Sequence, residues 1–164
     1  MVDKAIYEQV HRWMETHKEN MINDIQRIVR IPSISNPLEE VKPFGAACRL
    51  AMDEMLQIGR EHGFHTENYE YYVGSIGEKE KNWDDMIGFW NHLDVVPVGE
   101  GWDFDPFGAE LKGDLLIGRG SQDNKGPAIG MLYVMECIRD LKLPVGHQLC
   151  LFVGSDEERG MADL

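Results

Sequence analysis

Two short, nearly continuous apolar segments, at Met86–Trp90 and Gln148–Val153, constrain the fold of this chain most strongly. Runs of this kind are typical of strands that are covered on both faces of a sheet. Between them, apolar residues at helical spacing predict a helix that begins just after Asp123 and ends before Pro144. Strand, helix and strand in this order indicate an α/β fold, in which ligands gather at the carboxyl ends of the strands.

The rest of the 164 residues fits one domain of the same class. Apolar periodicity predicts a helix over Asp3–Val29 and a second helix that starts at Pro43 and runs toward Gly63. Alternation and aromatic residues predict a strand over Phe64–Val73. Turn signals predict a charged turn at Gly77–Asn82 and a hairpin of Phe107–Leu111 and Leu115–Gly118 around Lys112-Gly113-Asp114.

Composition narrows the class of protein. A hydrophobic share of 43% and a charged share of 27% are those of an ordinary soluble globular protein. A net charge of −13 without a basic cluster argues against a nucleic-acid partner. We expect no membrane association and a cytoplasmic location, because no apolar run approaches ~18 residues and no secretory signal is visible at the N-terminus. Three scattered cysteines in apolar surroundings are expected to be reduced core thiols: Cys48, Cys137 and Cys150.

His92 and Asp94 follow the first apolar strand. Residues two apart in extended backbone point the same way, so Asp94 can reach the imidazole of His92. A carboxylate on one ring nitrogen fixes the tautomer and strengthens the other nitrogen as a metal ligand. The alternative for this pair alone is a surface histidine beside a turn aspartate.

Further carboxylates come at the start of the predicted helix and after the second strand. Asp123 follows a glycine-rich loop that lets the backbone come close to a charged centre, although it could equally cap the helix. Glu157 and Glu158 are adjacent and therefore point apart, so one can bind metal while the other acts as a general base. A solvated acidic loop is the alternative. The Gly118-x-Gly120 pair does not predict dinucleotide binding, because Asp123 stands where a third glycine is needed.

Taken together, these groups predict a metal site at strand ends. Imidazole and carboxylate ligands without thiolate suit a hydrolytic zinc, cobalt or manganese site better than a structural zinc. An acidic calcium-binding module could use the same carboxylates, but His92 and the absence of an alternating aspartate loop argue against it.

At these residues the sequence resembles the zinc metallopeptidase family of aminoacylase, glutamate carboxypeptidase, succinyl-diaminopimelate desuccinylase and carnosinase-like dipeptidases. The resemblance covers about Gln26 to Gly160. Within the family, the sequence is most similar to bacterial Xaa-His and β-alanyl dipeptidases. Its motifs are His-x-Asp-x-Val-Pro from His92, Gly-Arg-Gly-x-x-Asp-x-Lys-Gly from Gly118, and Asp-Glu-Glu from Asp156. It implies a three-layer α/β sandwich with a mixed, largely parallel central sheet that is incomplete at the C-terminus.

The resemblance also implies roles. His92 and Glu158 would each hold one of two zinc ions, with Co²⁺ or Mn²⁺ as possible replacements, and Asp123 would bridge them. Asp94 would orient His92, and Glu157 would be the general base that moves a proton from water to the leaving amine of a dipeptide. The family further has a cis peptide after the bridging aspartate, which predicts one between Asp123 and Asn124.

Residues 1–164 would then be the N-terminal portion of a zinc-peptidase catalytic domain, without the lid domain and the C-terminal half. The family completes each metal with a ligand further downstream, so we expect this chain alone to bind zinc weakly and not to turn over dipeptides. The competing interpretation is a non-catalytic fragment that acts by association with itself or with a full-length enzyme. Exposed apolar surface on an incomplete sheet would favour a homo-oligomer.

Overall fold

The computed structural model describes residues 3–163 and has a four-stranded mixed sheet with three long helices. The strand order is β1-β2-β6-β3, in which β1 pairs with β2 and β2 with β6 antiparallel, while β3 and β6 run parallel. The bounds in this sheet are β1 His65–Tyr69, β2 Val73–Gly77, β3 Met86–His92 and β6 Gln148–Gly154. A separate hairpin pairs β4 Glu110–Lys112 with β5 Leu115–Ile117, and a 3-10 turn, η1, spans Trp83–Asp85.

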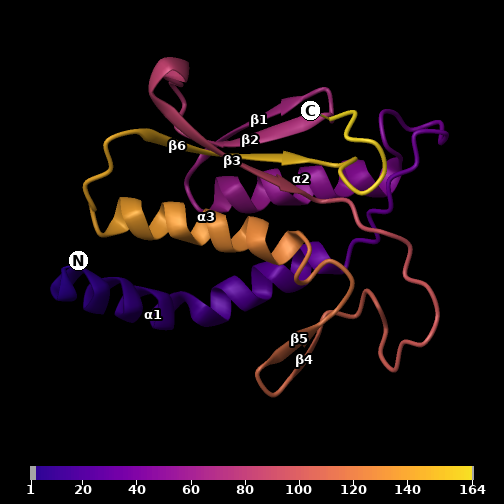
Figure 1. Cartoon of the computed structure of the whole chain (residues 1–164), viewed down its shortest axis with the longest axis horizontal. Coiled ribbons are helices and arrows are strands. Elements are labelled where there is room, and N and C mark those ends of the chain that lie inside the picture. The colour runs from indigo at the N-terminus through magenta and orange to yellow at the C-terminus, as the bar shows by residue number, and fades with distance from the viewer. Residues whose placement is uncertain (1–2, 164) are drawn as a thin grey trace.

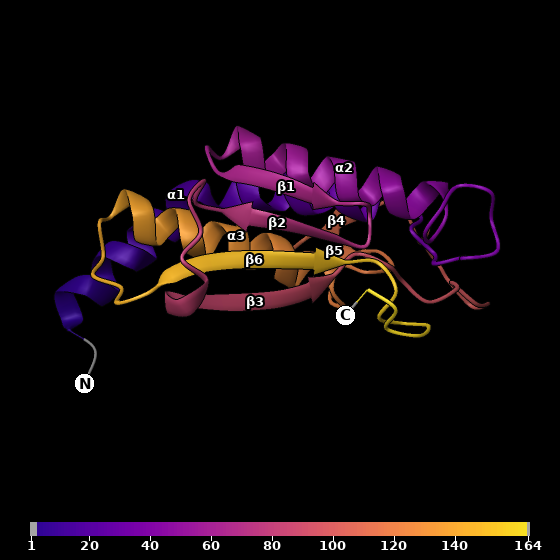
Figure 2. The ribbon, with the colours of Figure 1, turned by 90° about the horizontal axis from the view of Figure 1, so that it is seen from above.

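The helices lie on one face of the sheet (Figures 1 and 2). They are α1 Lys4–Val29, α2 Ala46–Glu61 and α3 Lys125–Asp140. Helices α2 and α3 contact the strands, and α1 packs on both of these helices. The interface forms one core, in which Ile76 of β2 and Leu151 of β6 are fully buried with Met52, Met55 and Leu132 of the helices above them. Burial of this apolar layer is the main term that holds helices and sheet together.

The α/β class and the mixed sheet are confirmed, but two details of the expected sandwich are corrected. Of the three strand pairs, only β3 with β6 is parallel, so the sheet is not largely parallel. Within residues 3–163, β3 pairs with β6 alone and the second face carries no helix, so neither apolar strand is covered on both faces. Ile87 and Trp90 of β3 are accordingly 42% and 37% exposed.

The local predictions hold best where sequence periodicity was strongest. The predicted first helix is α1, capped by the Asp3 side chain, which accepts a hydrogen bond of 2.8 Å from the Ala5 N–H. The predicted helix after Asp123 is α3, and the predicted hairpin is β4–β5, although both strands are shorter than expected. All three cysteines are free and buried.

Two boundaries were wrong. Pro43 follows a cis peptide bond, and the second helix begins later, at Ala46. The predicted strand over 64–73 is interrupted, because Glu70 and Tyr71 adopt positive φ in a turn and β2 begins only at Val73. Neither residue is a turn-forming glycine or asparagine, and the available signal was Asn68, whose side chain accepts a hydrogen bond from the Tyr71 N–H at 2.7 Å.

None of the helices within residues 3–163 combines the length and apolar character that a membrane crossing needs.

Candidate metal centre

The parallel pairing of β3 and β6 brings the candidate residues to one edge of the sheet. His92 is in register with Gly154, and the Leu93 N–H donates to the Gly154 carbonyl at 2.9 Å. The chain that leaves β3 carries Asp94, and the chain that leaves β6 carries Glu157 and Glu158. Because parallel strands end at the same edge, groups 60 residues or more apart in sequence become neighbours.

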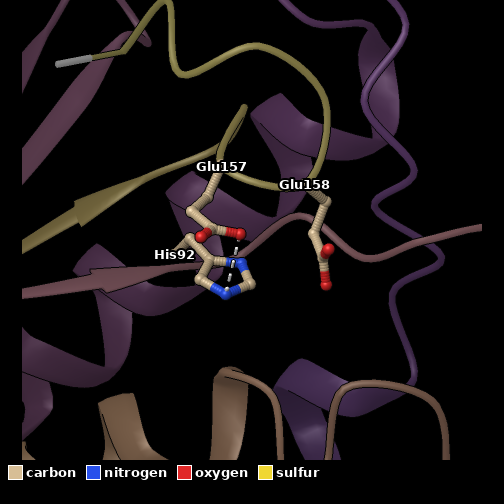
Figure 3. Close-up of side chains that lie close together, drawn as sticks. All are labelled: His92, Glu157 and Glu158. Carbon is tan, nitrogen blue, oxygen red and sulfur yellow. Dashed lines mark ion pairs between the residues drawn. The ribbon is translucent and has the colours of Figure 1, made fainter.

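His92, Glu157 and Glu158 form the group that could hold a metal ion, with one potential ligand atom from each lying within 4.8 Å of the others. The imidazole is buried, and its Nε2 lies 3.7 Å from a carboxylate oxygen of Glu157. Figure 3 shows Glu157 over the ring of His92 and Glu158 to one side of it, both on the loop after β6. Both glutamates thus approach the same imidazole, although adjacent residues were expected to point apart.

Asp94 contacts both parts of this group. A carboxylate oxygen of Asp94 lies 3.4 Å from Nδ1 of His92, and its backbone carbonyl lies 3.1 Å from the same nitrogen. The same carboxylate accepts hydrogen bonds from the backbone N–H groups of Glu157 at 3.2 Å and Glu158 at 3.0 Å. Asp94 is fully buried, so these contacts are shielded from water. Asp94 therefore reaches the imidazole, as its spacing predicted, and also contacts the loop that carries both glutamates, which its spacing did not predict.

Asp123 reaches the other ring nitrogen from the loop before α3. Its Oδ1 lies 3.1 Å from Nε2 of His92, while its side chain stays 73% exposed. The peptide bond between Asp123 and Asn124 is cis, as expected. The loop folds tightly onto the helix start, since a Cβ at Gly126 would lie 2.0 Å from the Ser121 carbonyl oxygen. Asp123 is thus in contact with His92, but it is not a member of the close group that His92 forms with the two glutamates.

Electrostatics at the edge reflect this crowding of carboxylates. Burial disfavours the charged imidazole, but the hydrogen bond and charge of Asp94 outweigh it and raise the pKa of His92 to about 9. Burial, and then the charge of Asp123, raise the pKa of Glu158 above its ordinary value. A site that raises the pKa of a carboxyl group in this way is short of positive charge.

Two supporting residues were not singled out from the sequence. Lys125, the first residue of α3, is fully buried, and its Nζ donates to the Ile31 carbonyl oxygen at 2.6 Å, which ties the loop of Asp123 to the segment after α1. Burial lowers the pKa of Lys125 to about 8. The Ser35 hydroxyl donates to Asp156 at 2.5 Å. Lys125 lies inside the quoted motif, which was the available signal, whereas no local pattern links Ser35 to Asp156.

Cavities lie on both sides of Glu158. One of about 540 Å³ is formed by the loop from Gly118 to Asp123 together with Val96 and Glu158. The other, of about 420 Å³, is lined by Val96 and Glu158 and by Ile34, Ser35, Asn36, Val95, Pro97 and Arg159. Glu158 therefore stands between a polar cavity and a more apolar one.

The residues present fit a divalent metal by the chemistry of their donors. One buried imidazole and carboxylates from two loops converge, and no cysteine belongs to this group. Burial, and then the charge of Asp94, raise the pKa of the Cys48 thiol to about 12, so it is not a thiolate. This donor set is that of hydrolytic zinc, cobalt or manganese sites.

Curated relatives match most of the chain. It is 36% identical over 143 residues to "Putative dipeptidase YtjP" of Bacillus subtilis, which covers 86% of this chain and 30% of that protein. It is 34% identical over 151 residues to a protein of Staphylococcus haemolyticus with a similar name, covering 89% of this chain and 32% of the other. The chain thus spans about a third of the length of these relatives.

Solved structures share the fold. Human carnosine dipeptidase 1 superimposes with a TM-score of 0.79 at 22% identity, over 96% of this chain and 36% of that one. An M20 family metallo-carboxypeptidase of Sulfolobus solfataricus gives a TM-score of 0.70 at 21% identity, over 84% and 31% of the two chains. Residues 88–164, which include every candidate ligand, match Peptidase family M20/M25/M40. These residues therefore form part of a Peptidase M20 family domain.

Proposed function

We propose that this chain is the N-terminal portion of the catalytic domain of a zinc-dependent dipeptidase, and that it contributes part of a two-zinc site. The observation that carries the proposal is the convergence of His92, Glu157 and Glu158 within 4.8 Å, with Asp123 against the same imidazole. Support comes from the names of the curated relatives, which describe dipeptidases.

The residues divide the chemistry among themselves. His92 and Glu158 would each hold one metal ion, and Asp123 would contribute its carboxylate to both. Metal bound here would polarise the scissile carbonyl and lower the pKa of water. Glu157 accepts a proton from the attacking water and delivers it to the leaving amine. Asp94 keeps Nδ1 of His92 occupied, so that Nε2 faces the site.

A dipeptide suits the space around Glu158. With the scissile amide beside this residue, one half of the substrate enters the polar cavity at Gly118–Asp123 and the other enters the cavity lined by Ile34, Val95 and Pro97. Together the cavities are in the range of small-molecule sites.

Metal binding and hydrolysis are tested separately. Titration of the chain with Co²⁺, followed by calorimetry and visible spectroscopy, is expected to show binding that Glu158→Gln weakens strongly and Glu157→Gln weakens less, because Glu157 is assigned to proton transfer. The absence of any binding by the unmodified chain would contradict the proposal.

For hydrolysis, the 164 residues are joined to the remaining two thirds of the Bacillus subtilis relative in place of its own matching part. This chimera is expected to cleave dipeptides with zinc, and Glu157→Gln is expected to lower kcat by at least about 10²-fold while the protein still binds metal. The chain alone is expected to show no enzymatic turnover. A chimera that folds and binds metal but is unaffected by Glu157→Gln would rule out this residue as the base.

A second candidate function, association with another copy or with a full-length enzyme, is favoured by one observation. The face of the sheet without helices exposes Trp83 and Trp90, at 64% and 37%, beside the β3 edge, which has no second partner strand among the described residues. Such an edge can pair with another chain. Sedimentation with and without zinc is expected to show a discrete dimer if the chain associates with itself, and a monomer would exclude this self-association.

A further inference from the structure

Three helices meet at a second histidine, His62, far from the candidate metal centre. His62 directly follows α2, and its ring lies between a carboxylate of α1 and a carboxylate of α3. Its Nε2 is 2.9 Å from Oδ2 of Asp24, and its Nδ1 is 2.7 Å from Oε2 of Glu136. The three side chains are only 15%, 10% and 13% exposed. Both nitrogens of one imidazole therefore face acceptors in a largely buried position.

The number of protons on the ring follows from this geometry. A neutral imidazole has a single N–H, so it could donate to Asp24 or to Glu136 but would turn a lone pair toward the other carboxylate. Only the imidazolium donates to both. The pKa of His62 is raised, chiefly by the hydrogen bond with Asp24, against the opposing effect of burial. Burial acts to raise the pKa of Asp24, but the hydrogen bonds of His62 and Tyr133 outweigh it and lower that pKa, so Asp24 is a carboxylate.

The surrounding groups give each of these two carboxylates a second cationic partner. From α1, Arg27 donates to Asp24 and to Glu54 and Glu61 of α2. From α3, the Tyr133 hydroxyl donates to Asp24 at 2.8 Å. Also from α3, Arg139 donates to the His62 carbonyl at 2.7 Å and pairs with Glu136 and Asp140. Each carboxylate beside His62 thus has another donor, and the imidazolium is the one group that touches carboxylates from both α1 and α3.

We propose that protonated His62 is a pH-dependent clasp that joins α1, α2 and α3, and that loss of its proton as the pH rises loosens the packing of α1. On deprotonation the ring keeps one N–H for two largely buried carboxylates, so one of them loses a donor and faces the lone pair of the ring instead. Loss of a charge-assisted hydrogen bond at a buried position is destabilising.

The direction of the pH effect follows from linkage. Because the pKa of His62 is higher in the folded than in the unfolded chain, its contribution to stability is fully present below about pH 6.5 and is lost as the pH rises through the folded-state pKa. His92 and Lys125 titrate in the alkaline range, with pKa values of about 9 and about 8. Both are present in every variant compared below, so their effects cancel when the pH dependence of one variant is subtracted from that of another.

The test combines histidine NMR with urea unfolding of the metal-free chain at several values from about pH 6 to pH 9. The His62 resonance is expected to titrate above about pH 6.5. The unfolding midpoint of the unmodified chain is expected to fall more across this range than that of His62→Gln, and Glu136→Gln is expected to fall between them. His147→Gln is the matched control, since His147 pairs with a single carboxylate at an exposed position and should leave the pH dependence unchanged.

Two results would overturn the clasp. One is a His62 resonance that titrates at or below its ordinary value, and the other is an equal fall of the midpoint in all variants. If His62→Gln does not fold, Glu136→Gln carries the comparison, because it keeps the contact of His62 with Asp24. Hydrogen exchange measured from about pH 6 to pH 9, and corrected for the intrinsic pH dependence of exchange, locates the effect in the structure. Amides of α1 should lose more protection than amides of β6. Equal losses in the two elements would count against loosening of α1.

Discussion

His62 and His92 both lie between carboxylates, and they differ in what else those carboxylates touch. Around His62, Asp24 and Glu136 have further partners in Arg27, Tyr133 and Arg139. Around His92, no lysine or arginine within residues 3–163 pairs with Asp123, Glu157 or Glu158. Both carboxylates beside His62 thus have an arginine partner, whereas the carboxylates around His92 have none and leave a surplus of negative charge at the edge of the sheet.

This difference separates a structural histidine from a candidate ligand. A buried charge that is fully partnered holds elements together and has no need of a ligand. Carboxylates that converge on one imidazole without cations repel one another, and a divalent cation relieves that repulsion. Substitution of His92 should therefore weaken metal binding, whereas substitution of His62 should not.

The largest difference is expected between substitutions of the two histidines. His92→Asn should weaken Co²⁺ binding by more than about 100-fold, because it removes the imidazole ligand. It should also lower the urea midpoint at about pH 6, because the raised pKa of His92 means that its charged form stabilises the folded chain. His62→Gln should lower the urea midpoint at about pH 6 and leave Co²⁺ affinity within about threefold, since it is remote from the site. Calorimetry and unfolding of both variants check this. Equal effects of both substitutions on metal affinity would remove the distinction between the clusters.

Asp94→Asn comes next. It should weaken metal binding by about 10- to 100-fold, which is the usual cost of losing a group that orients a ligand. It should also increase hydrogen exchange at the Glu157 and Glu158 amides, because an amide oxygen accepts less strongly from their N–H groups. If metal affinity falls while exchange at these two amides is unchanged, Asp94 acts on the ring alone.

The pH dependence of metal binding is a third expectation. His92 must lose its proton before Nε2 can bind metal, and its pKa of about 9 keeps it protonated at neutral pH. Apparent Co²⁺ affinity should therefore rise about tenfold for each pH unit up to about pH 9 and then level off. Calorimetry at several pH values measures this slope. An affinity that is flat between about pH 7 and pH 9 would show that His92 is not a ligand.

The smallest effect is expected at Tyr133. Tyr133→Phe removes one of three donors to Asp24 and should lower the free energy of unfolding by about 1 kcal/mol, without changing Co²⁺ affinity. Urea unfolding at a fixed pH gives the value. A change in metal affinity would instead reveal coupling between the His62 cluster and the edge of the sheet.

Local patterns predicted a large part of this structure. The helices α1 and α3, the strands β3 and β6 and the β4–β5 hairpin follow from apolar periodicity and turn residues, which report interactions between near neighbours in sequence. The turn at Glu70 and Tyr71 was missed because neither residue favours positive φ, and the cis bond before Pro43 was missed because an X-Pro pair does not reveal its isomer.

The sequence by itself determined the types of donor and their position at the ends of strands, since His92, Asp94, Asp123, Glu157 and Glu158 each follow a periodic segment or precede one. Tertiary structure decided which of them meet. The parallel register of β3 and β6 places both glutamates beside His92, and the packing of α1, α2 and α3 brings Asp24, His62 and Glu136 together. Such contacts join residues 38 to 74 positions apart in the second cluster, so only burial of the common core brings them within hydrogen-bonding distance.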